Sequence, residues 1–339
     1  CPQPLFDTLA NLQDSVNSQR IDRQHQAEFE LTLRFLLSYR GSEATFNAYR
    51  RELERFLQWC WHVEKTSLFN VKREQIEDYV QFCQHPPLSW RGLKQVPRFI
   101  VLSGKRVANT AWRPFVVTRS KAQAAANKTL TRKDFALSQK AIQAIFAVLS
   151  SFYQYGIQEQ VIAYNPVSQI RQKSRFIRKT QARPVVRRLT ELQWSYVIDT
   201  ATSMANQDSL HERTLFIMNA LYGMYLRISE LAASARWQPQ MGHFSRDHDQ
   251  NWWFNTVGKG NKERMISVSD AMLNALKRYR LSLGLSALPP PGDNTPLIMA
   301  SRGHQPLSST RQIRNIVQKC FDTAIDKMHQ DGFQEESES

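Results

Sequence analysis

The chain has 339 residues, of which 42% are hydrophobic and 11% aromatic, so it can form two domains with buried cores and is not a disordered polymer. Lysine and arginine number 45 against 30 acidic residues, and the net charge of +15 predicts a polyanionic partner. No apolar run approaches membrane-spanning length and the N-terminus does not resemble a secretory signal, so we expect a cytoplasmic protein. The four cysteines lack paired ligand spacing, which argues against a zinc site and fits thiols in a reducing cytoplasm.

Three helices are predicted after a polar N-terminal segment. Residues 1–23 are expected to form an arm or a frayed helix. Apolar residues then recur at helical spacing over 24–39, 45–57 and 72–83. Gly41 and Ser42 end the first of these helices and cap the second.

A basic insert at 85–133 follows. It contains eleven lysines and arginines and no acidic residue, and prolines and glycines interrupt it. Trp90, Trp112 and Phe115 are interleaved with the cations, so part of the insert is expected to pack. The insert is either a solvated loop whose charge aids solubility or a contact surface for nucleic acid, and an all-positive segment of this length favours nucleic acid.

The first domain is predicted to end with a helix over 138–155. Gly156 is placed to stop this helix. Residues 169–188 are basic and form either a nucleic-acid-binding linker or a solvated tether. The second domain begins at Leu189, where Thr190 is an N-cap candidate for the next helix.

An apolar run that contains one arginine is the main feature of the second domain. From Leu215 to Leu231 the apolar residues recur at helical spacing, which predicts a buried helix or a pair of helices. Arg227 and Glu230 would be neighbours on one face if the helix continues there. The arginine needs a partner because an unpaired buried charge is costly. It either forms an internal ion pair that organises the core or is held by Glu230 and directed at an anion.

A β-hairpin is predicted next. Strand-forming residues at 252–257 and 265–268 flank Gly258-Lys259-Gly260-Asn261, a turn with a lysine between two glycines. Lysines at hairpin tips are usually only solvated, but glycines let the backbone approach a ligand closely, and Lys262 and Arg264 follow at alternating spacing. Beyond the hairpin we expect a helix over 270–283, a short strand over 296–299 and a helix that Leu307-Ser308-Ser309 caps.

Two of these motifs together resemble the tyrosine recombinase, or phage integrase, family. The residues L-R-I-S-E-L at 226–231 and G-K-G-N-K-E-R at 258–264 occur in that family's order. The resemblance implies that Arg227 binds the scissile phosphate, that Lys259 protonates the leaving 5′ oxygen and that Glu230 braces the site. T-x-x-x-Y-x-x-x-L at 45–53 is similar to the helix that opens the family's core-binding domain.

The resemblance also implies a fold and an assembly. The fold would be mainly α with a small β-sheet (α+β), in which a helical, SAM-like core-binding domain and a catalytic domain form a C-shaped clamp around double-stranded DNA. The expected division is an arm at 1–23, the core-binding domain at 24–168, a basic linker at 169–188 and the catalytic domain at 189–339. A homotetramer on paired DNA sites, with no metal or other cofactor, would be the family's working form.

The sequence departs from the family in two places. After the hairpin the family has an H-x-x-R box and a tyrosine nucleophile, whereas His304 and His329 lack an arginine three residues on and the last tyrosine, Tyr279, is predicted to lie in an ordinary helix. The nucleophile is therefore unassigned, and we expect a chain without the C-terminal catalytic segment to bind DNA without cleaving it. We call the L-R-I-S-E-L motif at 226–231 the arginine box. Immediately before it, Tyr225 stands where the family commonly has glycine, which bears on the local turn geometry.

Site-specific DNA recombination through a 3′-phosphotyrosine intermediate is the expected activity. The basic insert favours an integrase of a phage or mobile element, bacterial or phage-encoded, although a chromosome-dimer resolvase and a transposon recombinase remain open. The alternative is a non-catalytic DNA-binding or regulatory relative. The candidate DNA contacts are basic residues of the helix at 45–57, the insert, the linker and the hairpin, namely Arg50, Lys94, Lys105, Arg106, Arg113, Arg119, Lys121, Lys128, Arg171, Lys173, Arg175, Arg178, Lys179, Lys262 and Arg264.

Overall fold

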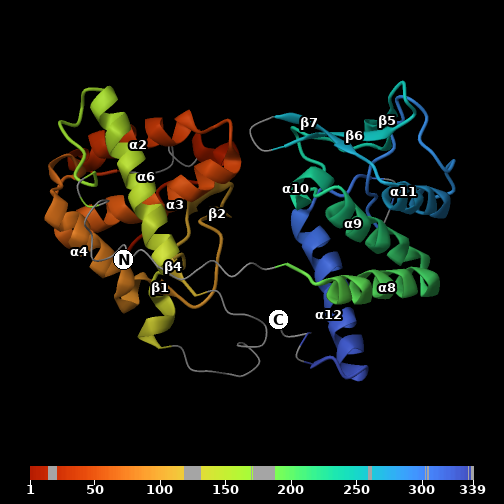
Figure 1. Cartoon of the computed structure of the whole chain (residues 1–339). Coiled ribbons are helices and arrows are strands. Elements are labelled where there is room, and N and C mark those ends of the chain that lie inside the picture. The colour runs from red at the N-terminus through yellow and green to blue at the C-terminus, as the bar shows by residue number, and fades with distance from the viewer. Residues whose placement is uncertain are drawn as a thin grey trace. The chain divides into compact units, whose positions relative to one another are not determined.

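The chain divides into two compact units, Cys1–Arg183 and Pro184–Ser339, each with its own core (Figure 1). The computed structural model describes residues 1–13, 21–117, 131–168, 170, 188–258, 262–301, 303, 305–334 and 336. Both units are mainly helical and each has small β-structures, which confirms the predicted fold class. Within these ranges, no helix is both long and apolar enough to cross a membrane.

Four long helices carry the core of the described N-terminal unit, and all four were predicted: α2 (Gln26–Ser38), α3 (Glu43–Trp59), α4 (Arg73–Gln84) and α6 (Gln139–Gln158). Their apolar faces meet in one cluster, in which Phe35 lies edge-on to Phe152 with the ring centres 5.4 Å apart. α3 continues into a π-helical turn, Cys60–Glu64, and ends where Lys65 adopts a left-handed conformation. Short 3-10 turns complete the unit.

The described start of the chain, residues 1–13, is packed, which corrects the expectation of an arm or a frayed helix. Leu5 and Phe6 are buried, and Phe6 stacks on Phe29 with the ring centres 5.0 Å apart. The backbone N–H groups of Leu5 and Phe6 donate to the carboxylate of Glu54, which is fully buried in α3. The polar composition of this segment concealed its anchor, because one carboxylate distant in sequence supplies the acceptor.

Part of the basic insert forms two small β-structures, made by β1 (Arg91–Gly92), β2 (Phe99–Leu102), β3 (Lys105–Ala108) and β4 (Phe115–Val116). β1 pairs with β4 in parallel, and β2 and β3 form an antiparallel hairpin whose turn places Ser103 and Gly104 at positive φ. Trp90, Trp112 and Phe115 are buried, which confirms that the aromatic residues of the insert pack.

Gly156 does not end its helix, which corrects the predicted stop. α6 runs two residues further, to Gln158. A Cβ atom at Gly156 would come within 2.4 Å of Cδ1 of Ile162, a buried residue of the following loop. The glycine therefore permits the loop to pack closely against the helix, and its presence marks a tertiary contact.

The described C-terminal unit contains a three-stranded sheet and the helices α8 (Glu191–Gln207), α9 (Glu212–Gly223), α10 (Ile228–Leu231), α11 (Asp270–Ser282) and α12 (Thr310–Gln330). The strands β5 (Phe244–Arg246), β6 (Trp252–Val257) and β7 (Glu263–Ser267) are antiparallel in sequence order. As predicted, Thr190 caps α8 by accepting from the backbone N–H of Gln193, and Ser309 caps α12 in the same way. The segment predicted as a strand at 296–299 makes only isolated bridges.

Candidate active site

A short loop between α9 and α10 presents the arginine box. α9 ends at Gly223, and Arg227 occupies the N-cap position of α10. The pair of helices agrees with the prediction, but Arg227 lies ahead of its helix and not on the helical face that would have placed it beside Glu230. The carboxylate of Glu230 instead reaches back: it accepts from the backbone N–H of Arg227 at 2.7 Å and from Nη1 of the same arginine at 3.1 Å.

Glu230 binds two arginines from different parts of the unit. Its side chain is only 2% exposed, and its second oxygen accepts from Nη2 of Arg264, on β7, at 2.6 Å. The indole N–H of Trp237 donates to the backbone carbonyl of Glu230 at 2.9 Å, and this hydrogen bond helps to hold the backbone of α10 in place. Two guanidinium groups on one carboxylate leave a net positive charge, and 60% of the Arg227 side chain remains exposed. The cluster can therefore present a positioned cation to an anionic ligand.

The hairpin approaches this cluster through Gly258. The N–H of Gly258 donates to the carbonyl of Lys262 at 2.8 Å and closes the loop between β6 and β7. A Cβ atom at Gly258 would lie 3.2 Å from Oε1 of Glu230 and 3.5 Å from Nη1 of Arg227. A glycine at this position therefore lets the hairpin backbone meet the ion pair directly. Lys259 is the next residue in the chain, and it lies outside the described residues together with Gly260 and Asn261.

The other two hairpin cations are placed differently. Lys262 is exposed, and its contact with DNA stays a prediction. Arg264 is bound to Glu230 and, more weakly, to the carbonyl of Tyr225 at 3.5 Å, with its side chain 37% exposed. Arg264 is therefore a member of the arginine box cluster, and the alternation of the sequence alone did not reveal that partnership.

Arg50 is buried, which removes it from the candidate DNA contacts. Its guanidinium donates to the backbone carbonyl of Asp7, and burial, followed by the neighbouring Arg98, lowers the pKa of Arg50 to about 10. Arg50 was a candidate contact as a basic residue of the helix at 45–57, but the N-terminal segment covers α3 at this residue. This burial was not visible in the pattern of α3 itself.

The basic insert contains cations of two kinds. Lys94 and Lys105 are exposed. Arg106 pairs with the buried carboxylate of Asp7 at 2.6 Å, and Arg113 donates to the backbone carbonyls of Thr110 and Trp112. The remaining candidates of the insert and the linker lie outside the described residues: Arg119, Lys121, Lys128, Arg171, Lys173, Arg175, Arg178 and Lys179.

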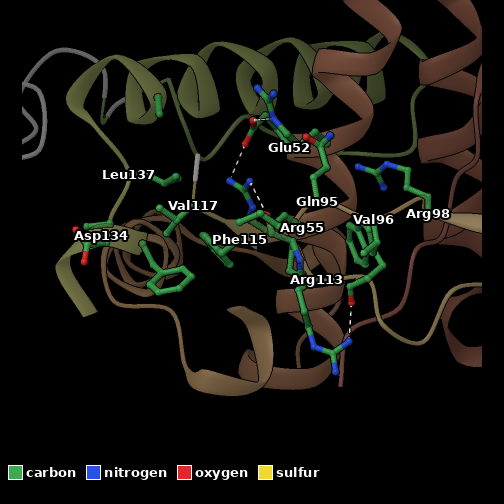
Figure 2. Close-up of a pocket in the computed structure, with 17 residues that line it drawn as sticks. Glu52, Arg55, Gln95, Val96, Arg98, Arg113, Phe115, Val117, Asp134 and Leu137 are labelled. Atoms are coloured by element: carbon green, nitrogen blue, oxygen red, sulfur yellow. Dashed lines mark hydrogen bonds and ion pairs between the residues drawn. The ribbon is translucent and has the colours of Figure 1, made fainter. Parts of the chain in front are cut away.

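A pocket between α3 and the insert shows how these arginines are used (Figure 2). Arg55 lies at its centre, binds Glu52 at 3.0 Å, donates to the carbonyl of Pro114 and packs over the ring of Phe115. Arg98 also lines this pocket, away from Arg55, and pairs with Glu54. The guanidinium groups here tie the insert to α3, so the pocket is an attachment site within the unit and not an open anion site.

Histidine and tyrosine near the site have structural contacts. His243 and Arg246 have the H-x-x-R spacing but precede the hairpin: the His243 ring stacks on Trp237, whereas Arg246 packs over Trp252 and donates to Gln250. Tyr279 is buried, its hydroxyl accepts from the N–H of Met299, and burial raises its pKa. Tyr279 is thus a core residue, in agreement with its assignment to an ordinary helix. In the part of the chain that the structure describes, no group of three or more His, Cys, Asp or Glu side chains could hold a metal ion.

The sequence comparisons all match proteins of one family. Residues 30–95 match the phage integrase N-terminal SAM-like domain. The chain is 24% identical over 182 residues to "Tyrosine recombinase XerC" of Chlorobaculum parvum, which covers 51% of this chain and 52% of that protein. It is 31% identical over 142 residues to the XerC of Alcanivorax borkumensis, which covers 42% of this chain and 41% of that protein. The matched region spans about half the length of these curated relatives.

A solved structure has a similar fold. It is described as the XerH site-specific recombinase bound to palindromic difH substrate in a post-cleavage complex. The TM-score is 0.53 at 10% sequence identity, and the match covers 94% of this chain and 73% of that one. At this identity the likeness concerns the fold alone.

Proposed function

Because the chain belongs to the tyrosine recombinase family, we propose that it binds double-stranded DNA and takes part in site-specific recombination of DNA strands. In this proposal Arg227 binds non-bridging oxygens of the scissile phosphate and Glu230 is the carboxylate that positions it. Lys259 donates the proton to the leaving 5′ oxygen. Integration or excision of a phage or mobile element by a homotetramer on paired sites is the role we assign.

The observation that carries the proposal is the single buried carboxylate shared by Arg227 and Arg264. A flexible exposed arginine would lose side-chain entropy on binding a phosphate, and its charge would already be solvated. Here Glu230 holds one edge of the Arg227 guanidinium, which leaves the remaining donors free for an anion. Gly258 brings the backbone of the Lys259 hairpin to the same place.

The chemistry requires positioning and charge neutralisation. A tyrosine oxygen attacks the phosphorus, the P–O5′ bond breaks, a 3′-phosphotyrosyl bond forms, and the leaving 5′ oxygen takes a proton from Lys259. Arg227 stabilises the charge that develops on the non-bridging oxygens. The bond energy is kept in the covalent intermediate, so this route requires no nucleotide cofactor. The nucleophilic tyrosine stays unassigned.

The role of Arg227 as a phosphate ligand can be tested through the salt dependence of binding. For Arg227→Gln we expect the slope of log Kd for a mixed-sequence DNA duplex against log salt concentration to fall by about 1, because one phosphate contact is lost. Arg278→Gln is the matched control. Arg278 belongs to the same unit and also pairs with a carboxylate, that of Glu212, at a distance of 2.8 Å, but it is not part of the arginine box. Equal slopes in both variants and the unmodified chain would reject the assignment of Arg227.

Covalent capture separates catalysis from binding alone. The chain is incubated with a library of fragmented bacterial DNA, and protein–DNA adducts are isolated under denaturing conditions. Adducts whose protein end maps to a tyrosine would support the recombinase, and their loss in Arg227→Gln would place Arg227 in the reaction. Specific binding without any adduct would favour the non-catalytic DNA-binding relative.

A further inference from the structure

Tyr225 combines an unfavourable backbone conformation with an exposed aromatic ring at the edge of the arginine box. Its φ is +50°, in the left-handed region, and 79% of the residue is exposed. Its neighbours Met224 and Leu226 are both buried, so the loop is anchored on either side while the ring stays outside. A bulky residue seldom occupies this conformation, because its Cβ atom crowds the backbone.

The side chain of Tyr225 makes no specific polar or aromatic contact with the described part of its own chain. Within those ranges its side chain takes part in no hydrogen bond, ion pair or ring stack, and only its backbone carbonyl is used, as an acceptor for Arg264 at 3.5 Å. Glycine would fill the same backbone position without steric cost. Residues with a strained backbone conformation are enriched at functional sites. The conformation of Tyr225 therefore suggests that its ring has a function outside the packing of this chain.

The position of Tyr225 limits what the ring can meet. Two residues of chain span at most about 7 Å, so the ring starts close to any anion bound at Arg227. Successive nucleotides along one DNA strand are separated by about 3.4 Å of helix rise. A phosphate at Arg227 would therefore bring the adjoining nucleotide within reach of the ring. If strands are exchanged at that phosphate, the bases beside the break must leave their partners, and each exposes a flat face.

We propose that Tyr225 is a positioning residue that stacks on an unpaired base next to the phosphate bound by Arg227. The inference rests on the proposed function and adds to it a contact for the separated strand. Stacking between a base and an aromatic ring tolerates any sequence, since every base has a π face. The contact uses the ring and not the hydroxyl, so phenylalanine and tryptophan should replace tyrosine.

Four variants separate the backbone from the ring. Tyr225→Ala removes the ring but keeps the left-handed strain, whereas Tyr225→Gly removes both. Tyr225→Phe and Tyr225→Trp retain an aromatic ring. In thermal unfolding, Tyr225→Gly should exceed Tyr225→Ala in Tm by about 3 °C, because only glycine relieves the strain.

DNA binding should follow the ring and not the backbone. With a fluorescein-labelled single-stranded oligothymidine at low salt, the alanine and glycine variants should bind about tenfold more weakly than the unmodified chain, and by similar factors. The phenylalanine and tryptophan variants should bind as the unmodified chain does. With a fully paired mixed-sequence duplex the loss should be smaller, because the bases are stacked inside the helix.

The outcomes separate this inference from the proposed function. Unchanged oligothymidine binding by the alanine and glycine variants would overturn the role of Tyr225, and so would a tenfold loss in the phenylalanine variant. If the salt slope still falls in Arg227→Gln, the proposed function survives that result. If the salt slope of Arg227→Gln is also unchanged, the assignment of Arg227 as the phosphate ligand fails as well.

Discussion

Glu54 in the N-terminal unit and Glu230 in the C-terminal unit are both buried carboxylates that bind arginine, yet their surroundings differ. Glu54 accepts from the backbone of Leu5 and Phe6 and from Arg98, whose side chain is 15% exposed. Glu230 accepts from Arg227 and Arg264, whose side chains are 60% and 37% exposed. In the first cluster, Arg98 is largely buried, and its ion pair with Glu54 holds the unit together. The second leaves Arg227 largely exposed, and that difference, more than the number of arginines, is the reason for proposing a ligand site there.

Removing each carboxylate should have the largest effect and should separate the two clusters. Glu54→Gln should destabilise the N-terminal unit by about 3–5 kcal/mol, because the neutral amide keeps an acceptor oxygen for the backbone but leaves the largely buried Arg98 without its counter-charge. Glu230→Gln should cost less, about 2 kcal/mol, because its arginines can turn toward water. Urea unfolding measures both effects. Equal losses would show that exposure of the arginines does not distinguish the clusters.

The same two variants should differ in DNA binding. Glu230→Gln releases Arg227 from its carboxylate, so the affinity for a DNA duplex should fall despite the gain of positive charge. Glu54→Gln, measured where the unit is still folded, should leave the salt slope unchanged. A tighter complex with Glu230→Gln would mean that charge alone, and not positioning, governs binding.

Two adjacent residues of β3 offer a smaller test of the contrast between free and engaged cations. Lys105→Gln should weaken duplex binding by a few-fold and lower the salt slope by about 1, with stability unchanged within about 0.5 kcal/mol. Arg106→Gln should instead cost about 2 kcal/mol, because it leaves the buried Asp7 carboxylate without its partner. The pair can be compared by anisotropy and urea unfolding. Reversed effects would contradict the assignment of Arg106 as a structural residue.

The smallest expected effect is a dependence of stability on pH, caused by His243, which stacks on the Trp237 that contacts Glu230. Burial lowers the pKa of His243, whose Nδ1 accepts from the N–H of Gln240 and whose ring stacks on Trp237. Since the unfolded chain binds this proton with a pKa near 6.5, the native state should lose stability as the pH falls through about 6.5, until the lowered pKa is passed. His243→Gln should reduce the difference between urea midpoints at pH 7.5 and pH 5.5. His248→Gln, which alters an exposed histidine of the same unit, is the control; an equal reduction there would reject the role of His243.

Local patterns in the sequence were sufficient for most helices and for the strands of the hairpin. Helical periodicity located α2, α3, α4 and α6, and Thr190 and Ser309 cap the helices that they were predicted to begin. These features depend on residues three or four positions apart, so a short window contains their cause. The arginine box and the glycine-flanked lysine were recognised by their resemblance to a known family, and the position of Lys259 stays a prediction.

What only the tertiary structure decided depends on contacts between residues far apart in the chain. The burial of Arg50, the packing of residues 1–13 and the internal use of Arg106 all follow from the N-terminal segment lying on α3 and the insert. Gly156 and Gly258 look alike in sequence, but one admits a neighbouring loop and the other the ion pair of Arg227. The sequence by itself determined which residues can carry charge and which can form helices. Folding decided which charges remain free, because a guanidinium is neutralised by whichever carboxylate the chain brings to it.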